Sequence, residues 1–167
     1  MRNVHIGGVY GLYLSLGSNQ GDRRYYIQEA IRMLDEGLKM QHSAISSLLE
    51  FSSWGFDGAD FLNCVVRYDI PSVGQDLLLH ARAVLGLAKE IEHRLGRRQG
   101  IAFDSTGKRV YQDRPIDIDI LFVGDLRVNE PLLTIPHKLI RERDFVKVPL
   151  QEVATPEIRS VFPEIFA

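Results

Sequence analysis

The sequence predicts an α+β fold in which two helices cover one face of an antiparallel sheet. Apolar residues recur at helical spacing in two stretches, 27–38 and 75–95, and short runs rich in β-branched and aromatic residues flank them. Turn-forming residues separate these runs. With 167 residues and 45% hydrophobic content, the chain is expected to form a single domain, 11–167, after a flexible lead, 1–10.

The composition argues against several classes of protein. A formal net charge of −2 gives no overall attraction to nucleic acid or to an anionic membrane. No apolar run approaches the roughly 18 residues needed to span a bilayer, and the N-terminus has no signal-peptide pattern, so we expect a cytoplasmic protein. Cys64 is the single cysteine and lies in an apolar run, which indicates a core position.

The first half of the chain contains three predicted strands and one helix. A strand over 12–16 leads into a turn whose last residue, Asp22, can cap the following helix. Gly37 can end that helix in the left-handed conformation that glycine tolerates. A strand over 41–49 and another over 61–70 follow, joined by a loop rich in aromatic residues.

The second half begins with the longest predicted helix, 75–95, which Gly96 is expected to end. No sustained period follows in 97–114, and such a long segment is typical of a lid or a binding loop. Residues 89–114 hold seven basic and four acidic side chains, a local charge of +3. A solvated basic loop is the simpler interpretation; the alternative is a lid whose arginines clamp phosphates.

The strand after this loop carries the main chemical signal. Asp117 and Asp119 lie two residues apart, so both carboxylates leave the same face of the strand. An edge strand with a hydrated polar face would explain an isolated pair. Because two charges beside a core need compensation, arginine partners or Mg²⁺ are the alternative. The residues expected on the opposite, buried face are Ile116, Ile118, Ile120 and Phe122.

The strand over 61–70 and the loop before it carry a second signal. Phe61 and Asn63 share one face, where a ring and an amide could stack on and hydrogen-bond a heterocycle. A buried amide with satisfied hydrogen bonds is an equally good interpretation of Asn63. Trp54 and Phe56 could form the wall of a site for a flat ligand, although loop aromatics more often cover the core.

A turn at 124–125, a returning strand over 132–135 and a helix over 146–153 complete the chain. The order is β-α-β-β-α-β with a C-terminal extension, which is the pattern of a ferredoxin-like sandwich. This fold by itself does not specify a chemistry.

Taken together, the motifs resemble the 6-hydroxymethyl-7,8-dihydropterin pyrophosphokinases, enzymes of folate biosynthesis. The similarity runs from about Tyr13 to about Ala154. Its landmarks, in chain order, are Leu14-Ser15-Leu16-Gly17-Ser18-Asn19, Phe61-Leu62-Asn63, Ile91-Glu92-His93-Arg94-Leu95-Gly96-Arg97, Arg114-Pro115-Ile116-Asp117-Ile118-Asp119-Ile120-Leu121, Ile135-Pro136-His137 and Arg143-x-Phe145.

The resemblance implies transfer of the terminal diphosphate of ATP to the pterin hydroxymethyl group, with release of AMP. It implies two Mg²⁺ held by Asp117 and Asp119, and catalytic roles for Arg97 and Arg114 beside them. The residues that it implies for ATP binding are Glu92, Arg97, Arg114, His137, Lys138 and Arg143. Those that it implies for pterin binding are Trp54, Phe61, Asn63 and Phe145.

Four departures from the family pattern affect the loops around the metal pair. Phe51-Ser52-Ser53 replaces a Thr-x-Pro-like turn, and Gln99 replaces an arginine of the lid. Tyr111 stands where tryptophan is common, and Lys138 where an aromatic is often seen.

Two other classes of function are alternatives to the resemblance: a two-metal nucleotidyl or glycosyl transferase, and an RNA-binding module that displays aromatics on its sheet.

Overall fold

The structure is a computed structural model of the chain. The residues that it describes are 8–53, 58–72, 74, 76–96, 102–103, 105–107, 109–110 and 115–167. Within them, no helix is both long enough and apolar enough to cross a membrane.

An antiparallel sheet forms the centre of the molecule, in the order β2-β4-β1-β7, with β3 also paired to β4. Its three long strands are β1 (Val9–Ser18), β4 (Phe61–Pro71) and β7 (Asp117–Val123), and its two short ones are β2 (Ala44–Ile45) and β3 (Leu49–Phe51). β1 lies between β4 and β7 and is antiparallel to both. The expected combination of an antiparallel sheet with helices is confirmed.

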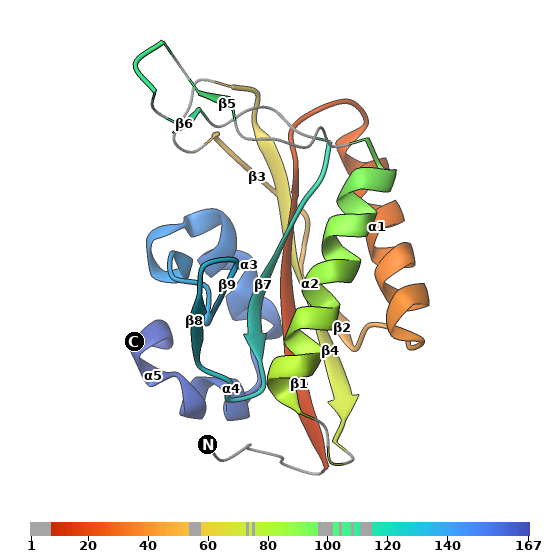
Figure 1. Ribbon diagram of the computed structural model, residues 1–167, viewed down its shortest axis with the longest axis vertical. Helices are drawn as coiled ribbons and strands as arrows, with labels where there is room; N and C mark the ends of the chain where they lie inside the picture. The colour runs from red at the N-terminus through yellow and green to blue at the C-terminus, as the bar shows by residue number, and fades with distance from the viewer. Residues whose placement is uncertain are drawn as a thin grey trace.

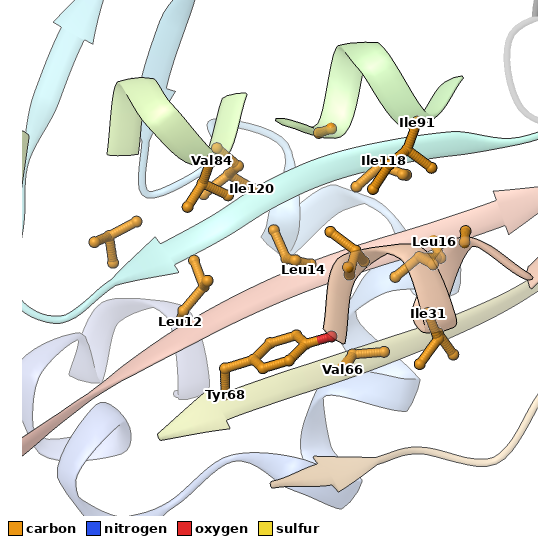
Figure 2. Close-up of a cluster of buried hydrophobic side chains, with 14 of the residues drawn as sticks. Leu12, Leu14, Leu16, Ile31, Val66, Tyr68, Val84, Ile91, Ile118 and Ile120 are labelled. Carbon is orange, nitrogen blue, oxygen red and sulfur yellow. The ribbon is translucent and has the colours of Figure 1, made fainter. Parts of the chain in front are cut away.

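Helices α1 (Arg23–Leu38) and α2 (Leu77–Arg94) cover one face of this sheet (Figure 1). Asp22 accepts the N–H of Tyr25 at the start of α1, as expected, and Asp76 accepts two N–H groups at the start of α2. Figure 2 shows side chains of both helices packed on the sheet. This helix-side core includes Leu12, Leu14, Leu16, Ile31, Val66, Val84, Ile91, Ile118 and Ile120.

The prediction that Gly37 ends α1 is wrong, because the helix continues through it to Leu38. Lys39 takes the left-handed conformation instead, with φ of 57°. A Cβ on Gly37 would lie 2.6 Å from Cδ1 of Leu87 in α2. The glycine therefore lets the two helices approach each other. Gly96, with φ of 96°, does follow the end of α2 as predicted.

The predicted strand over 41–49 is two short strands, β2 and β3, which pair with different parts of β4. Ser46, between them, donates its backbone N–H to Val65, and its Oγ accepts the N–H of Val65 at 2.9 Å. Ser47 bonds the carboxylate of Glu152 through both its N–H and its Oγ. Because serine side chains compete with ladder hydrogen bonds, the pairing is interrupted here.

The segment after β7 forms a turn and returns beside that strand, as predicted. Leu126 N–H closes the turn onto the carbonyl of Val123, and β9 (Leu133–Ile135) lies close to β7. The hydrogen-bonded partner of β9 is β8 (Val128–Glu130), with which it forms a separate hairpin. Two short strands lie in the segment 97–114, which was expected to have no regular structure: β5 (Ala102–Phe103) pairs with β6 (Arg109–Val110).

The C-terminal part of the chain packs on the other face of the sheet (Figure 1). It contains a 3₁₀ turn (Ile140–Glu142), α3 (Asp144–Val153, close to the predicted helix), α4 (Pro156–Val161) and α5 (Pro163–Phe166). This C-terminal core includes Tyr13, Val65, Leu121, Phe122, Ile140, Val146, Leu150, Ile158 and Phe162.

The prediction that Phe122 shares a face with Ile116, Ile118 and Ile120 is wrong. The register between β1 and β7 shifts after Ile120, so Leu121 is the extra residue of a β-bulge. Leu121 and Phe122 consequently both pack into the C-terminal core, whereas the three isoleucines pack under the helices as predicted.

Candidate functional site

The register of the sheet places three predicted site residues on one face, the face opposite α1 and α2. Asn63 in β4 lies opposite Gly17 in β1, and Gly17 lies opposite Asp117 in β7. Ser15 lies opposite Asp119 in the same way. Directly opposed residues of neighbouring antiparallel strands project to the same side. The amide and the two carboxylates therefore occupy one face, with two small residues between them.

Gly17 separates the amide from the nearer carboxylate. A Cβ at this position would lie 2.5 Å from Nδ2 of Asn63 and 3.3 Å from Cδ1 of Phe61. A glycine is needed because the ring and the amide already occupy that space. Since neighbouring strands are about 4.8 Å apart, the backbones of Asn63 and Asp117 are separated by about 10 Å. A flat ligand of one or two rings fits this span.

The Asn63 side chain is buried, with only 3% of its surface exposed. Its Oδ1 has no hydrogen-bond partner among the described residues. A buried amide oxygen without a partner loses its hydration without replacement, which is unfavourable. The simpler interpretation of Asn63, a fully satisfied core amide, is therefore not supported, and a ligand N–H is the natural complement.

A cleft of about 370 Å³ opens beside the carboxylates, over the outer edge of β7. One wall comes from α2, another from the β8–β9 hairpin and the segment after it. The residues that line it are Leu85, Lys89, Glu92, Asp117, Ile118, Asp119, Ile120, Pro131, Leu132, Leu133, Thr134, His137, Lys138, Leu139 and Arg143. Six of these are residues predicted from the sequence to bind ATP or metal: Glu92, Asp117, Asp119, His137, Lys138 and Arg143.

His137 is held in the cleft wall as a neutral hydrogen-bond donor. Burial, together with the positive charges of Arg143 and Lys138, outweighs the opposing effect of Asp117 and lowers the pKa of His137 to about 4. Its Nδ1 accepts the N–H of Leu139 at 3.2 Å, so the ring proton is on Nε2. The backbone N–H of His137 donates to the carbonyl of Leu121, the bulge residue of β7.

Glu92 belongs to the α2 wall of the cleft and is buried, with 6% of its surface exposed. Its Oε2 accepts the backbone N–H of Ile118 at 2.8 Å. The carboxylate therefore contacts the β7 residue that stands between Asp117 and Asp119.

Arg143 and Phe145 lie at the start of α3. The Arg143 guanidinium is 5.5 Å from the centre of the Phe145 ring, a cation–π distance. Phe145 also packs against the C-terminal core. Its predicted pairing with Phe61 around a ligand stays a prediction.

Several predicted residues lie outside the described part of the chain: Trp54, Arg97, Gln99, Tyr111 and Arg114. Of the altered turn Phe51-Ser52-Ser53, Ser53 is described. Its Oγ accepts the N–H of Gly58 at 3.0 Å and donates to the Gly58 carbonyl at 3.1 Å. This serine therefore ties together the two ends of the loop that holds Trp54.

Two residues beside the predicted site residues were not assigned to the site from the sequence. Lys89, counted only among the basic residues of 89–114, is exposed and lines the cleft one helical turn before Glu92. Its i, i+3 spacing from Glu92 was a signal that could have placed it there. Gly17 was expected in the turn after the first strand and belongs to the first family motif, but its role as a spacer follows from its two neighbouring strands, which no local pattern reveals.

The carboxylate pair suits a metal that is only partly held by protein. Among the described residues, no group of three or more His, Cys, Asp or Glu side chains could hold a metal ion. Mg²⁺ is commonly bound by one or two carboxylates plus waters and substrate phosphates. Asp117 and Asp119, both partly exposed at the cleft, match that donor set.

Comparison with known proteins decides the family. The family model for 7,8-dihydro-6-hydroxymethylpterin-pyrophosphokinase (HPPK) matches residues 13–155. The chain belongs to this family. An HPPK-family relative from Aquifex aeolicus, named 2-amino-4-hydroxy-6-hydroxymethyldihydropteridine pyrophosphokinase, is 35% identical over 152 residues, which are 90% of this chain and 84% of the relative.

Two further relatives illustrate the range of the HPPK family. A protein of the same name from Porphyromonas gingivalis is 39% identical over 145 residues, covering 86% of this chain and 90% of the relative. The mitochondrial folate synthesis bifunctional protein of Pisum sativum is 37% identical over 142 residues, 84% of this chain but 24% of that protein.

Proposed function

We propose that the protein transfers diphosphate from ATP to the hydroxymethyl group of 6-hydroxymethyl-7,8-dihydropterin, giving AMP and the pterin diphosphate in folate biosynthesis. Membership of the HPPK family supports this activity. The observation that carries it is the row Asn63–Gly17–Asp117 on one sheet face, in which Oδ1 of Asn63 has no hydrogen-bond partner among the described residues and Asp117 lines the cleft.

In this proposal the pterin ring lies on the Asn63 side of Gly17. The Asn63 amide would complement the polar edge of the ring, with Oδ1 accepting an N–H that none of the described residues supplies. Phe61 would stack on one ring face, and Phe145 and Trp54 would complete the enclosure. The hydroxymethyl group would then point toward Asp117, because the remaining space along the row leads there.

ATP would occupy the cleft over the edge of β7. His137 would donate Nε2–H to a phosphate or ribose oxygen, and its lowered pKa keeps it neutral near pH 7. Arg143, Lys138 and Lys89 would contribute positive charge to the triphosphate. Glu92 would border the nucleotide at the α2 wall.

The donor set fits two Mg²⁺, which Asp117 and Asp119 would hold. When bound, the ions would neutralise the triphosphate charge and align the reacting oxygens. The hydroxymethyl oxygen attacks the β-phosphorus as the bond to the oxygen bridging the α-phosphorus breaks. AMP leaves with that electron pair, and the hydroxyl proton passes to solvent. Arg97 and Arg114 would neutralise the charge that develops on the bridging oxygen.

The same proposal includes a ferredoxin-like arrangement of the sheet and helices and a lid over the site. The order of the elements supports a ferredoxin-like sandwich, and the +3 charge of residues 89–114 supports a lid that closes over both substrates and excludes water.

The test is to incubate the protein with ATP, Mg²⁺ and 6-hydroxymethyl-7,8-dihydropterin and to separate the nucleotides. We expect AMP to form in equal amount with the pterin diphosphate, and neither to form when the pterin or Mg²⁺ is omitted. Production of ADP, or AMP release independent of the pterin, would contradict the proposal.

A further inference from the structure

We infer that Glu92 is a positioning residue, which fixes the metal-binding pair Asp117 and Asp119 by holding the backbone of the residue between them. The inference rests on the proposed function because its test includes a measurement of Mg²⁺ binding. The hydrogen bond made by Glu92 is present in the protein whatever its function. It assigns this buried carboxylate a task that is separate from any contact with the nucleotide.

β7 is the last strand of the central sheet, so no other described strand pairs with its outer edge. Along an edge strand, successive backbone groups point alternately to the neighbouring strand and away from it. The N–H of Ile118 points away, because Oε2 of Glu92 accepts it at 2.8 Å. The backbone groups of Asp117 and Asp119 are therefore directed toward β1, opposite Gly17 and Ser15.

The same β7 residue is also anchored through its side chain. Figure 2 shows Ile91 of α2 beside Ile118, and both are buried in the helix-side core. Two consecutive residues of α2 thus hold one residue of β7, Ile91 by packing and Glu92 by a hydrogen bond. Helix α2 thereby restrains the distance of β7 from the helix and the rotation of the strand about its own axis, at the point from which the two aspartates project.

The chemical identity of the residue supports a positioning role. A third carboxylate close to Asp117 and Asp119 adds like-charge repulsion and loses hydration, both of which oppose folding. A hydrogen bond from a backbone N–H to a carboxylate is stronger than one to a neutral acceptor. Outer partners of this kind orient metal-binding carboxylates, and their loss typically weakens metal affinity by 10- to 100-fold.

The test compares Glu92→Gln, which keeps an oxygen acceptor, with Glu92→Met, which removes it at similar volume. Ile91→Val is the matched control, because it weakens the adjacent packing contact and leaves the hydrogen bond. Two quantities are measured: amide hydrogen exchange at Ile118 in the protein without ligands, and the affinity for Mg²⁺ in the presence of a non-hydrolysable ATP analogue, by calorimetry.

We expect Glu92→Met to speed exchange at Ile118 by at least about tenfold relative to other β7 amides and to weaken Mg²⁺ binding by about 10- to 100-fold. Glu92→Gln and Ile91→Val should leave both quantities within about threefold of the unaltered protein. Pterin affinity should stay unchanged in all three, because the row at Asn63 is not altered.

Two results would overturn the inference. A loss of Mg²⁺ affinity in Glu92→Gln as large as in Glu92→Met would mean that the charge itself acts on the ligands. Unchanged Mg²⁺ affinity in Glu92→Met would mean that the strand does not need this anchor. If Glu92→Met does not fold, Glu92→Ala, which also removes the acceptor, takes its place in both measurements and is judged by the same outcomes. Failure of the proposed function would appear separately, as absence of pterin-dependent AMP formation by the unaltered protein.

Discussion

At the scale of single residues, the site depends on where side chains are small as much as on where they are charged. Gly17 and Ser15 stand opposite Asp117 and Asp119, so β1 leaves room on the face where the carboxylates project. A larger residue at Gly17 would collide with the Asn63 amide. The paired carboxylates and the Asn63 amide thus lie on one face of the sheet with small residues between them.

Replacing either carboxylate should abolish most of the activity without unfolding the protein. Asp117→Asn and Asp119→Asn each remove a negative charge from a proposed Mg²⁺ ligand, and we expect turnover to fall by several orders of magnitude. Steady-state AMP formation measures the effect. Asp22→Asn is the matched control, since asparagine also caps helices and should leave turnover unchanged. Near-normal rates in both site variants would identify Asp117-x-Asp119 as an ordinary hydrated edge strand.

Removing the Phe61 ring should affect one substrate selectively. If Phe61 stacks on the pterin, Phe61→Ala should weaken pterin binding by about 1 to 3 kcal/mol, or roughly 5- to 150-fold. Titration calorimetry with each substrate separately measures this, and Phe61→Tyr, which keeps a ring, should stay within a few-fold. An equal loss of ATP affinity in Phe61→Ala would count against the assignment.

At the scale of elements, the ends and the irregularities of strands and helices place the site. The bulge at Leu121 places two consecutive residues of β7, Leu121 and Phe122, in the C-terminal core, and the Leu121 carbonyl accepts the backbone N–H of His137. Asp76 begins α2 by accepting the N–H groups of Leu78 and Leu79 at 3.0 and 3.2 Å. The cap thus stabilises the helix whose far end carries Glu92.

Loss of this cap should lower stability with little effect on chemistry. We expect Asp76→Ala to reduce the free energy of unfolding by about 1 kcal/mol, because two N–H groups of the first turn lose their acceptor. Urea denaturation measures it. Glu90→Ala, an exposed position on the same helix, should change stability by less than about 0.5 kcal/mol. If the two variants were equally stable, the cap geometry would not contribute.

At the scale of the whole molecule, the sheet separates two cores and leaves one end of one face for ligands. The helix-side core fills the face under α1 and α2, and the C-terminal core covers Tyr13, Val65 and Phe122 on the other. The continuation of that second face carries Ser15, Gly17 and the site residues opposite them. The site is therefore the part of a sheet face that lies beyond the C-terminal core.

The C-terminal helices should contribute substantially to global stability through Phe162. This residue is fully buried and stacks on Phe122, with ring centres 5.0 Å apart. We expect Phe162→Ala to cost about 3 to 5 kcal/mol of unfolding free energy. Chemical denaturation measures it, with the partly exposed Val148→Ala as a control of small effect. A loss below about 1 kcal/mol would mean that the C-terminal helices contribute little to the fold.

Acid should destabilise the fold partly through His80. Its Nδ1 lies 2.6 Å from the Tyr10 hydroxyl, and burial lowers the pKa of His80 below its usual 6.5. The unfolded chain then binds a proton at higher pH than the folded one, so this contribution is present above pH 6.5 and is lost as pH falls below it. His80→Gln should flatten the dependence of unfolding free energy on pH below 6.5, and the exposed His93→Gln should not. An unchanged slope in His80→Gln would exclude this contribution.

The sequence by itself determined the elements and the chemistry that repeat locally. Helical spacing located α1 and α2, and runs of β-branched and aromatic residues between turn formers located β1, β4 and β7. The paired aspartates with their neighbouring motifs indicated the family before any contact was known. Such features depend on residues close together in the chain, where periodicity and capping act.

Only the tertiary structure decided how these parts meet. The bulge at Leu121 and the continuation of α1 through Gly37 each depend on packing against segments that are distant in the chain, and this packing overrides local preference. The same holds for Gly17 as a spacer and for Glu92 as an anchor of Ile118. These roles join residues from different strands and helices, and register and packing between elements, not local pattern, determine which of them touch.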